Sequence, residues 1–187
     1  MSSLKIRNDV ELRAFAEQNA EGLYAVVKEN YAHLRPFLHW VTPDYSSASA
    51  LEFIRRTEKA DAEKASRTFG IFCGEKIVGV IGFVNFGWES RSTEIGYWIA
   101  KNYEGKGIVT DSCKVLVGCA FRELELNRVE IRCATENERS RAIPERLDFK
   151  LEGVLRQALW RHTRFFDMAI YSLLAEEYSG NFERAEN

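Results

Sequence analysis

The stretch from residue 92 to residue 124 constrains the fold more than any other part of the chain. Residues 92–100 are typical of a strand and residues 105–124 of a long helix, and a turn with Gly105 and Gly107 connects them. The first N–H groups of a helix have no intrahelical partner and lie at the positive end of the helix dipole, so such a turn can bind phosphate. From these residues alone, a phosphate site and a plain tight turn remain equally open.

Two other phosphate-binding motifs do not fit this turn. The GxxxxGK[ST] loop of nucleotide-binding proteins is absent, and Thr110 stands where the dinucleotide fingerprint needs a third glycine or an alanine. The strand before the turn also reads as antiparallel to the strand before it, unlike the first unit of a dinucleotide-binding fold. The turn therefore belongs to another kind of α/β protein.

The rest of the chain predicts one domain with a mixed sheet. The hydrophobic period switches between two and about 3.6 along the sequence. Strands are expected over 9–15, 68–73, 76–86, 129–134, 150–159 and 164–174, and helices over 18–30, 31–40 with a break at Pro36, 46–65 and 140–147. We expect a single α/β (α+β, mixed-sheet) domain over residues 1–175, followed by a flexible C-terminal tail over 176–187.

Composition excludes several classes of partner and location. The 187 residues carry a formal net charge of −2, which gives no general attraction to nucleic acid or to an anionic membrane. The apolar run over 77–84 is far shorter than a membrane-spanning helix, and the N-terminus does not resemble a signal peptide, so a cytoplasmic protein is expected. The four cysteines form no CxxC pair and have no histidine nearby, so we expect free thiols and no metal site.

Five segments in order resemble one enzyme superfamily. They are residues 93–100 (TEIGYWIA), 103–108 (YEGKGI), 126–131 (LNRVEI), 137–140 (NERS) and 144–149 (PERLDF). Together they are similar to the GNAT superfamily of acetyl-CoA-dependent N-acetyltransferases, and within it to the Rim-type ribosomal-protein N-acetyltransferases. The resemblance implies the GNAT acyl-CoA N-acyltransferase fold, acetyl-CoA as co-substrate and no metal.

The resemblance also implies where coenzyme A binds. The pantetheine arm would lie in a gap beside the strand at residues 96–99, where Gly96 also suggests a bulge. Glu104 and Val109 depart from the usual Q/R-x-x-G-x-G/A loop, and we expect them to weaken binding by placing a negative charge and a branched side chain near the phosphates. Asn137 would bond pantetheine, with helix capping as the alternative. The expected cofactor-binding residues are Tyr97, Trp98, Ile99, Gly105, Lys106, Gly107, Ile108, Val109, Thr110 and Asn137.

Acetyl transfer needs a neutral amine and a proton for the departing thiolate. By resemblance, Ser140 is the acid that protonates the thiolate, with helix capping as the alternative. Glu94 is the candidate base, which would require burial to raise its pKa. The alternative is that Glu94 faces solvent or pairs with an arginine. Leu159 stands where some relatives carry a carboxylate, so a base from that position is absent.

The residues that would contact the acceptor are less well defined. Aromatic residues on strands are more often core than binding residues, so we expect Tyr97, Trp98 and Trp160 to be core. Phe37 and Trp40 are candidates for the acceptor wall, with core packing as the alternative. Arg161, His162 and Arg164 form a local basic cluster, which is either a solvated turn or a site for an acidic partner.

Three functions follow from these residues. The leading one is acetylation of the N-terminal α-amine of a protein, perhaps ribosomal. The second is acetylation of a small amine, such as an aminoacyl nucleotide or an antibiotic, for detoxification. The third is a CoA-binding module without turnover. The resemblance also leaves a homodimer through the C-terminal strands open.

Overall fold

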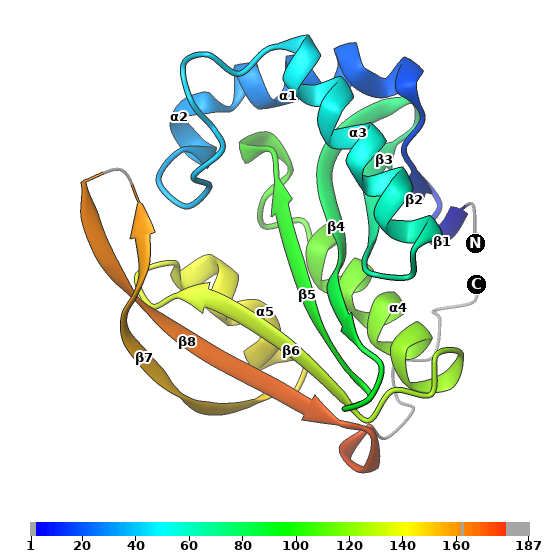
Figure 1. The fold of residues 1–187 in the computed structure, drawn as a ribbon, viewed down its shortest axis with the longest axis vertical. Coiled ribbons are helices and arrows are strands. Elements are labelled where there is room, and N and C mark those ends of the chain that lie inside the picture. Colours follow the sequence, from blue (N-terminus) through cyan, green and yellow to red (C-terminus); the bar gives the residue numbers. More distant parts are fainter. Residues whose placement is uncertain (1–2, 162, 179–187) are drawn as a thin grey trace.

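The computed structural model describes residues 3–161 and 163–178 and contains an eight-stranded sheet (Figure 1). Its order is β1-β2-β3-β4-β5-β6-β8-β7, and only β5 and β6 pair in parallel. The strands are β1 (Ser3–Arg7), β2 (Val10–Ala14), β3 (Arg67–Cys73), β4 (Lys76–Gly87), β5 (Ser92–Ile99), β6 (Arg128–Ala134), β7 (Lys150–Arg161) and β8 (Arg164–Leu174). The expected mixed sheet is confirmed.

Five α-helices lie on the two faces of this sheet. One buried cluster joins the first three helices to Phe72, Ile77 and Val80, and a second cluster joins the last two helices to buried residues of the six inner strands, β2 to β6 and β8. The helices are α1 (Ala20–Glu29), α2 (Tyr31–Leu34), α3 (Ser47–Ala62), α4 (Ile108–Arg122) and α5 (Glu138–Arg146), with short 3-10 turns at Glu17–Asn19, Lys101–Tyr103 and Ala175–Glu177. None of the helices in the described ranges is long and apolar enough to cross a membrane.

Several predicted boundaries are wrong. The sequence pattern missed β1, which pairs with β2 at the edge of the sheet. The helix expected over 31–40 ends at Leu34, two residues before Pro36, which has no N–H to donate and whose ring disfavours a helical preceding turn. The helix expected from residue 105 begins at Ile108, because Gly105 and Gly107 adopt left-handed backbone conformations. The cap at Ser46 is confirmed, since its side chain accepts a hydrogen bond from the amide of Ser49.

The two central strands separate after a short paired stretch. The pairing of β5 with β6 covers only Ser92 to Glu94 against Arg128 to Glu130. Beyond these pairs the strands diverge, β5 toward the layer of α1 to α3 and β6 toward the β7–β8 hairpin (Figure 1). The expected gap beside residues 96–99 therefore lies between two strand edges that face each other without pairing.

The bulge is not at Gly96, which pairs in regular register with Gly82. The register shift lies in β4 between Phe83 and Phe86, so that two residues of β4 lie opposite the single residue Glu94. A bulge bends a strand and increases its twist. The position of Glu94 thus marks the point at which the sheet opens.

The domain continues beyond residue 175. Glu177 forms an ion pair with Lys150, and the ring of Tyr178 lies 5.2 Å from the ring of Phe121 on α4. Residues 176–178 are therefore packed against the domain rather than part of a tail. The remainder of the expected tail, residues 179–187, lies outside the described residues.

Candidate active site

The glycine turn presents free amide groups at the start of α4. Gly105 has φ 70° and Gly107 has φ 76°, conformations that glycine adopts without strain. The first intrahelical hydrogen bond of α4 joins the amide of Asp111 to the carbonyl of Gly107, so the amides of residues 108–110 have no acceptor within the helix. Arg7 of β1 stabilises the turn from outside, donating to the Lys106 carbonyl over 3.0 Å.

The side chains of the two departing residues are not free beside the expected phosphate position. The Val109 side chain is buried in the core beneath α4, so it does not lie beside the phosphate position. Glu104 forms an ion pair with Arg139 of α5, and its second carboxylate oxygen lies 3.5 Å from Nε2 of His33. Burial lowers the pKa of His33 and favours its neutral form, so Arg139 supplies the compensating charge. This ion pair also connects the two sides of the gap, because Glu104 follows β5 and Arg139 follows β6.

Tyr97 and Ser140 meet across the gap. The Tyr97 hydroxyl donates to the Ser140 carbonyl over 2.9 Å, and Ser140 Oγ donates to the Tyr97 hydroxyl over 3.3 Å. Burial raises the pKa of Tyr97 well above its usual value, so its phenol stays protonated. Sequence reasoning included Tyr97 for its backbone and missed this contact of its side chain.

The start of α5 places Ser140. Asn137 caps the helix, with its Oδ1 accepting from the amide of Ser140 over 3.1 Å. The capping role of Asn137 is thus observed, and it leaves the Nδ2 group of the side chain for a second contact. The Ser140 side chain itself lies next to Cys133 of β6, whose pKa is raised by burial to about 11.

Glu94 lies on the other face of β5 from Tyr97, because alternate residues of a strand point to opposite faces. Burial raises the pKa of its carboxyl group, while the nearby Arg132 favours the charged form and lowers it. The distance from Arg132 Nε to the Glu94 carboxylate is 3.5 Å. Glu94 is therefore partly buried, as a base would require, and it is also paired with an arginine, as in the alternative.

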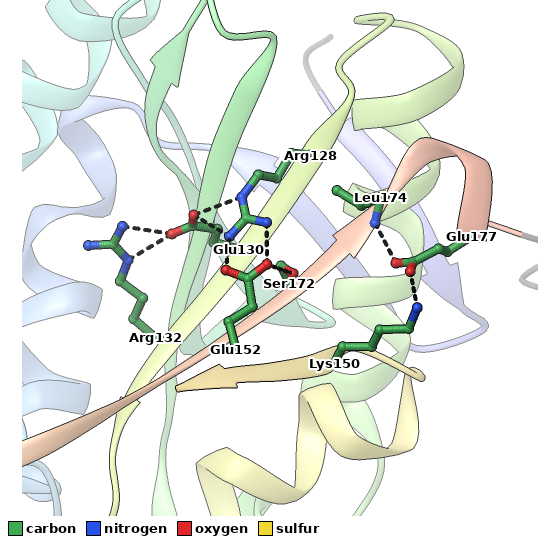
Figure 2. Close-up of polar contacts among 8 residues, drawn as sticks. All are labelled: Arg128, Glu130, Arg132, Lys150, Glu152, Ser172, Leu174 and Glu177. Carbon is green, nitrogen blue, oxygen red and sulfur yellow. Dashed lines mark hydrogen bonds and ion pairs between the residues drawn. The ribbon is translucent and has the colours of Figure 1, made fainter. Parts of the chain in front are cut away.

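Arg132 belongs to a chain of alternating charges across the sheet (Figure 2). Glu130 accepts from Arg132 over 2.8 Å and from Arg128 over 2.9 Å. Arg128 also donates to Glu152 of β7 over 2.7 Å, and Glu152 accepts from Ser172 of β8. The alternation of charged and apolar residues in the segment Arg128–Arg132 is the sequence signal that could have revealed this row of ion pairs.

The expected aromatic and basic residues separate into different environments. Trp40 and Trp98 lie together, with ring centroids 6.1 Å apart. Trp160 is 52% exposed, so its assignment to the core is wrong, and it packs on the exposed ring of Phe165. Two residues of the expected basic cluster have partners of their own, because Arg161 donates to the carbonyl of Phe37 and Arg164 pairs with Glu136. His162 lies outside the described residues.

Comparisons with known proteins agree with this geometry. The family described as "Acetyltransferase (GNAT) domain" matches residues 9–150. The chain is 37% identical to the "Putative ribosomal N-acetyltransferase YdaF" of Bacillus subtilis, over 96% of this chain and 99% of the relative.

Two solved structures extend the comparison. The structure of the ribosomal L7/L12 alpha-N-protein acetyltransferase RimL in complex with coenzyme A is 25% identical, with a TM-score of 0.89 over 94% of this chain and 99% of that one. The structure of the microcin C7 self-immunity acetyltransferase MccE with acetyl-CoA and AMP is 28% identical, with a TM-score of 0.88 over 92% and 96%. With its fold, its glycine turn and these relatives, the chain belongs to the GNAT family and is an N-acetyltransferase of the kind that includes the ribosomal-protein acetyltransferases.

Proposed function

We propose that this enzyme transfers the acetyl group of acetyl-CoA to the N-terminal α-amine of a protein. The observation that carries the proposal is the gap between β5 and β6, which leads from the free amides of α4 to the Tyr97–Ser140 pair. RimL and MccE were solved with coenzyme A and acetyl-CoA respectively, and the name of RimL specifies an α-amine acceptor. We propose the cytoplasm as the compartment and a ribosomal protein as the acceptor.

The residues along the gap fit the chemistry of acetyl-CoA. The amides of residues 108–110 and the exposed Lys106 suit a pyrophosphate, because an anion is stabilised at a helix N-terminus. The edge of β5 at residues 97–99 offers main-chain groups to the amides of the pantetheine arm. Asn137 adds a side-chain amide from the opposite side of the gap.

The reaction itself forms one bond and breaks one. The amine nitrogen attacks the thioester carbonyl carbon, the C–N bond forms, the C–S bond breaks, and the electron pair leaves on sulfur. Ser140 gives its proton to the thiolate and regains one from solvent after CoA has left, while the Tyr97 hydroxyl accepts from Ser140 Oγ and orients it. The proton lost by the amine goes to Glu94.

The base has a modest task and acts at a distance. An α-amine has a pKa near 8, so about a tenth of it is already neutral at pH 7. Glu94 is three residues from Tyr97, which corresponds to about 10 Å along a strand. A relay of more than one water molecule therefore completes the proposed path from the amine to the carboxylate.

The alternative acceptor is a small amine. The similarity to MccE, which was solved with AMP as well as acetyl-CoA, favours an aminoacyl nucleotide among the small amines. The two proposals are separated by the release of CoA thiol with three acceptors: a peptide with a free N-terminus, the same peptide with a blocked N-terminus and an internal lysine, and an aminoacyl nucleotide analogue. We expect rapid release only with the free N-terminus. Release only with the nucleotide analogue would replace the first proposal by the second, and tight CoA binding with no release would leave a binding module.

We predict that Gly105→Ala weakens acetyl-CoA binding at least tenfold. An alanine at φ 70° is strained by about 1–2 kcal/mol, and relief of that strain moves the amides of the turn. Gly74→Ala is a matched control, because Gly74 has φ 60° in a hairpin turn and both positions have open space for a Cβ. Calorimetry should show equal losses of stability in the two variants but a higher Kd only for Gly105→Ala, and an equal Kd would move the phosphate site elsewhere.

We predict that Ser140→Ala lowers kcat by about 10²-fold or more, the range of a lost general acid, with little change in the Kd of acetyl-CoA. Tyr97→Phe should lower kcat in the same direction, because it removes the hydroxyl that orients Ser140 Oγ. Ser90→Ala, on the hairpin between β4 and β5, is the matched control. The rate is measured by stopped-flow thiol release. If Ser140→Ala reacts as fast as the unchanged enzyme, Ser140 is not the acid.

We predict that Arg132→Gln moves the acidic limb of the rate profile to higher pH. A base acts when ionised, so the rate falls as the pH falls through the pKa of Glu94. Arg132 lowers that pKa, and its removal raises it. Arg164→Gln, which breaks the distant pair with Glu136, should leave kcat/KM unchanged across the pH range.

Glu94→Gln should lose most activity at pH values between the pKa of Glu94 and that of the acceptor amine, where the carboxylate is ionised and most of the amine is protonated, and least at high pH, where the amine is neutral without help. If the rate of Glu94→Gln equals that of the unchanged enzyme at every pH, Glu94 is not the base.

A further inference from the structure

An aromatic pocket lies beside the gap, on the face of the sheet that carries α1 to α3. It is a cavity of about 220 Å³. Trp98 of β5 contributes one wall, Trp40 and Tyr45 from the segment between α2 and α3 contribute two more, and Phe53 of α3 contributes a fourth. The ring centroids of Trp40 lie 6.1 Å from those of Trp98 and 5.5 Å from Tyr45.

The walls of this pocket are held in place by the fold. Val41, next to Trp40, is fully buried and anchors that segment in the core. The capping box of Ser46 and Ser49 starts α3 directly after Tyr45. Trp98 is fixed by the pairing of its backbone with Val80 of β4. The pocket is therefore formed before any ligand arrives.

The charge around the pocket selects a neutral group. Glu52 and Arg56 are both exposed at its rim and lie one turn apart on α3. The negative charge of Glu52 and the positive charge of Arg56 therefore offset each other. Burial raises the pKa of Tyr45 to about 12, which keeps its hydroxyl neutral. The walls are thus mainly aromatic, and the neutral hydroxyls of Thr42, Tyr45 and Ser49 are polar groups among them.

The position of the pocket connects it to the transfer site. Trp98 follows Tyr97 directly on β5, and adjacent residues of a strand point to opposite faces. Tyr97 contacts Ser140 at the gap, and Trp98 forms the wall of the pocket. The pocket therefore lies across β5 from the Tyr97–Ser140 contact, on the face that also carries Glu94, and Trp98 belongs to the stretch of β5 that has no partner on the side of the gap.

We propose that this pocket binds a planar aromatic ring of the acceptor, attached close to the amine that is acetylated. The proposal rests on the proposed function for the presence of an acceptor amine, and it names the chemistry that the acceptor carries. The cavity is smaller than the 300–1,000 Å³ of sites that enclose a whole ligand, so it holds one ring system. Rings pair favourably with surrounding rings in tilted or offset arrangements, which an aliphatic side chain cannot do.

The ring has two sources, and acceptor panels distinguish them. The first panel is the tetrapeptides Ser-Phe-Ala-Ala, Ser-Leu-Ala-Ala and Ser-Ala-Ala-Ala, in which leucine controls for apolar burial. The second is a non-hydrolysable seryl-adenylate analogue and its counterpart without the adenine base. We expect the member with a ring to exceed its partner about tenfold in kcat/KM, mainly through a lower KM.

Variants then assign the preference to the pocket. Trp40→Leu should bring the ratio between the phenylalanine and leucine peptides close to one, whereas Trp88→Leu, on the remote hairpin between β4 and β5, should preserve it. Equal kcat/KM for ringed and ringless acceptors, or a ratio that survives Trp40→Leu, would overturn the proposal.

A binding measurement separates this proposal from the proposed function. Quenching of tryptophan fluorescence by the N-acetylated phenylalanine and leucine peptides reports the pocket without turnover. Tighter binding of the phenylalanine peptide that is lost in Trp40→Leu supports the pocket, even if no peptide is acetylated and the proposed function fails. Acetylation of all peptides at equal rates, with equal binding, leaves the proposed function standing and removes the pocket.

Discussion

The partial pairing of β5 with β6 is the constraint on which the rest of the site depends. The two strands share three residue pairs and then separate. The bulge in β4 lies opposite Glu94, the last of these pairs, so one local irregularity coincides with both the opening of the sheet and the candidate base. The glycine turn, α5 and the aromatic pocket all adjoin the space that this separation creates.

Charges on both sides of the gap are balanced within the protein. Glu104 and Arg139 pair from opposite sides, and Arg128, Glu130, Arg132 and Glu152 form an alternating chain across the strands (Figure 2). An isolated exposed pair contributes little to stability, but a connected network fixes the orientation of each member. The main effect of this network is to hold Arg132 beside Glu94, where it acts on the ionisation of that carboxyl group.

The sequence predicted the fold well where hydrophobic period and turn residues agree. The hairpin of β3 and β4, the glycine turn and α4 are such cases, and five short motifs gave the family. It failed where tertiary packing decides. The sequence could not show that Val109 points into the core, that Glu104 has a cation from α5, or that Trp160 is exposed. The sequence indicated Ser140 and Tyr97 as separate site residues. It could not show their contact, because that contact depends on how far β5 and β6 separate.

The facing edges of β5 and β6 suggest that coenzyme A has a structural role in the sheet as well as a chemical one. The edge of β5 at residues 96–99 and the edge of β6 at residues 131–134 each pair with a strand on one side only. An unpaired edge is a template for any extended chain that carries amides at suitable spacing. The pantetheine arm has such amides, so under the proposed function it would take the place of a missing ninth strand in the gap. Its arrival would turn two half-sheets, joined by three pairs, into one continuous sheet.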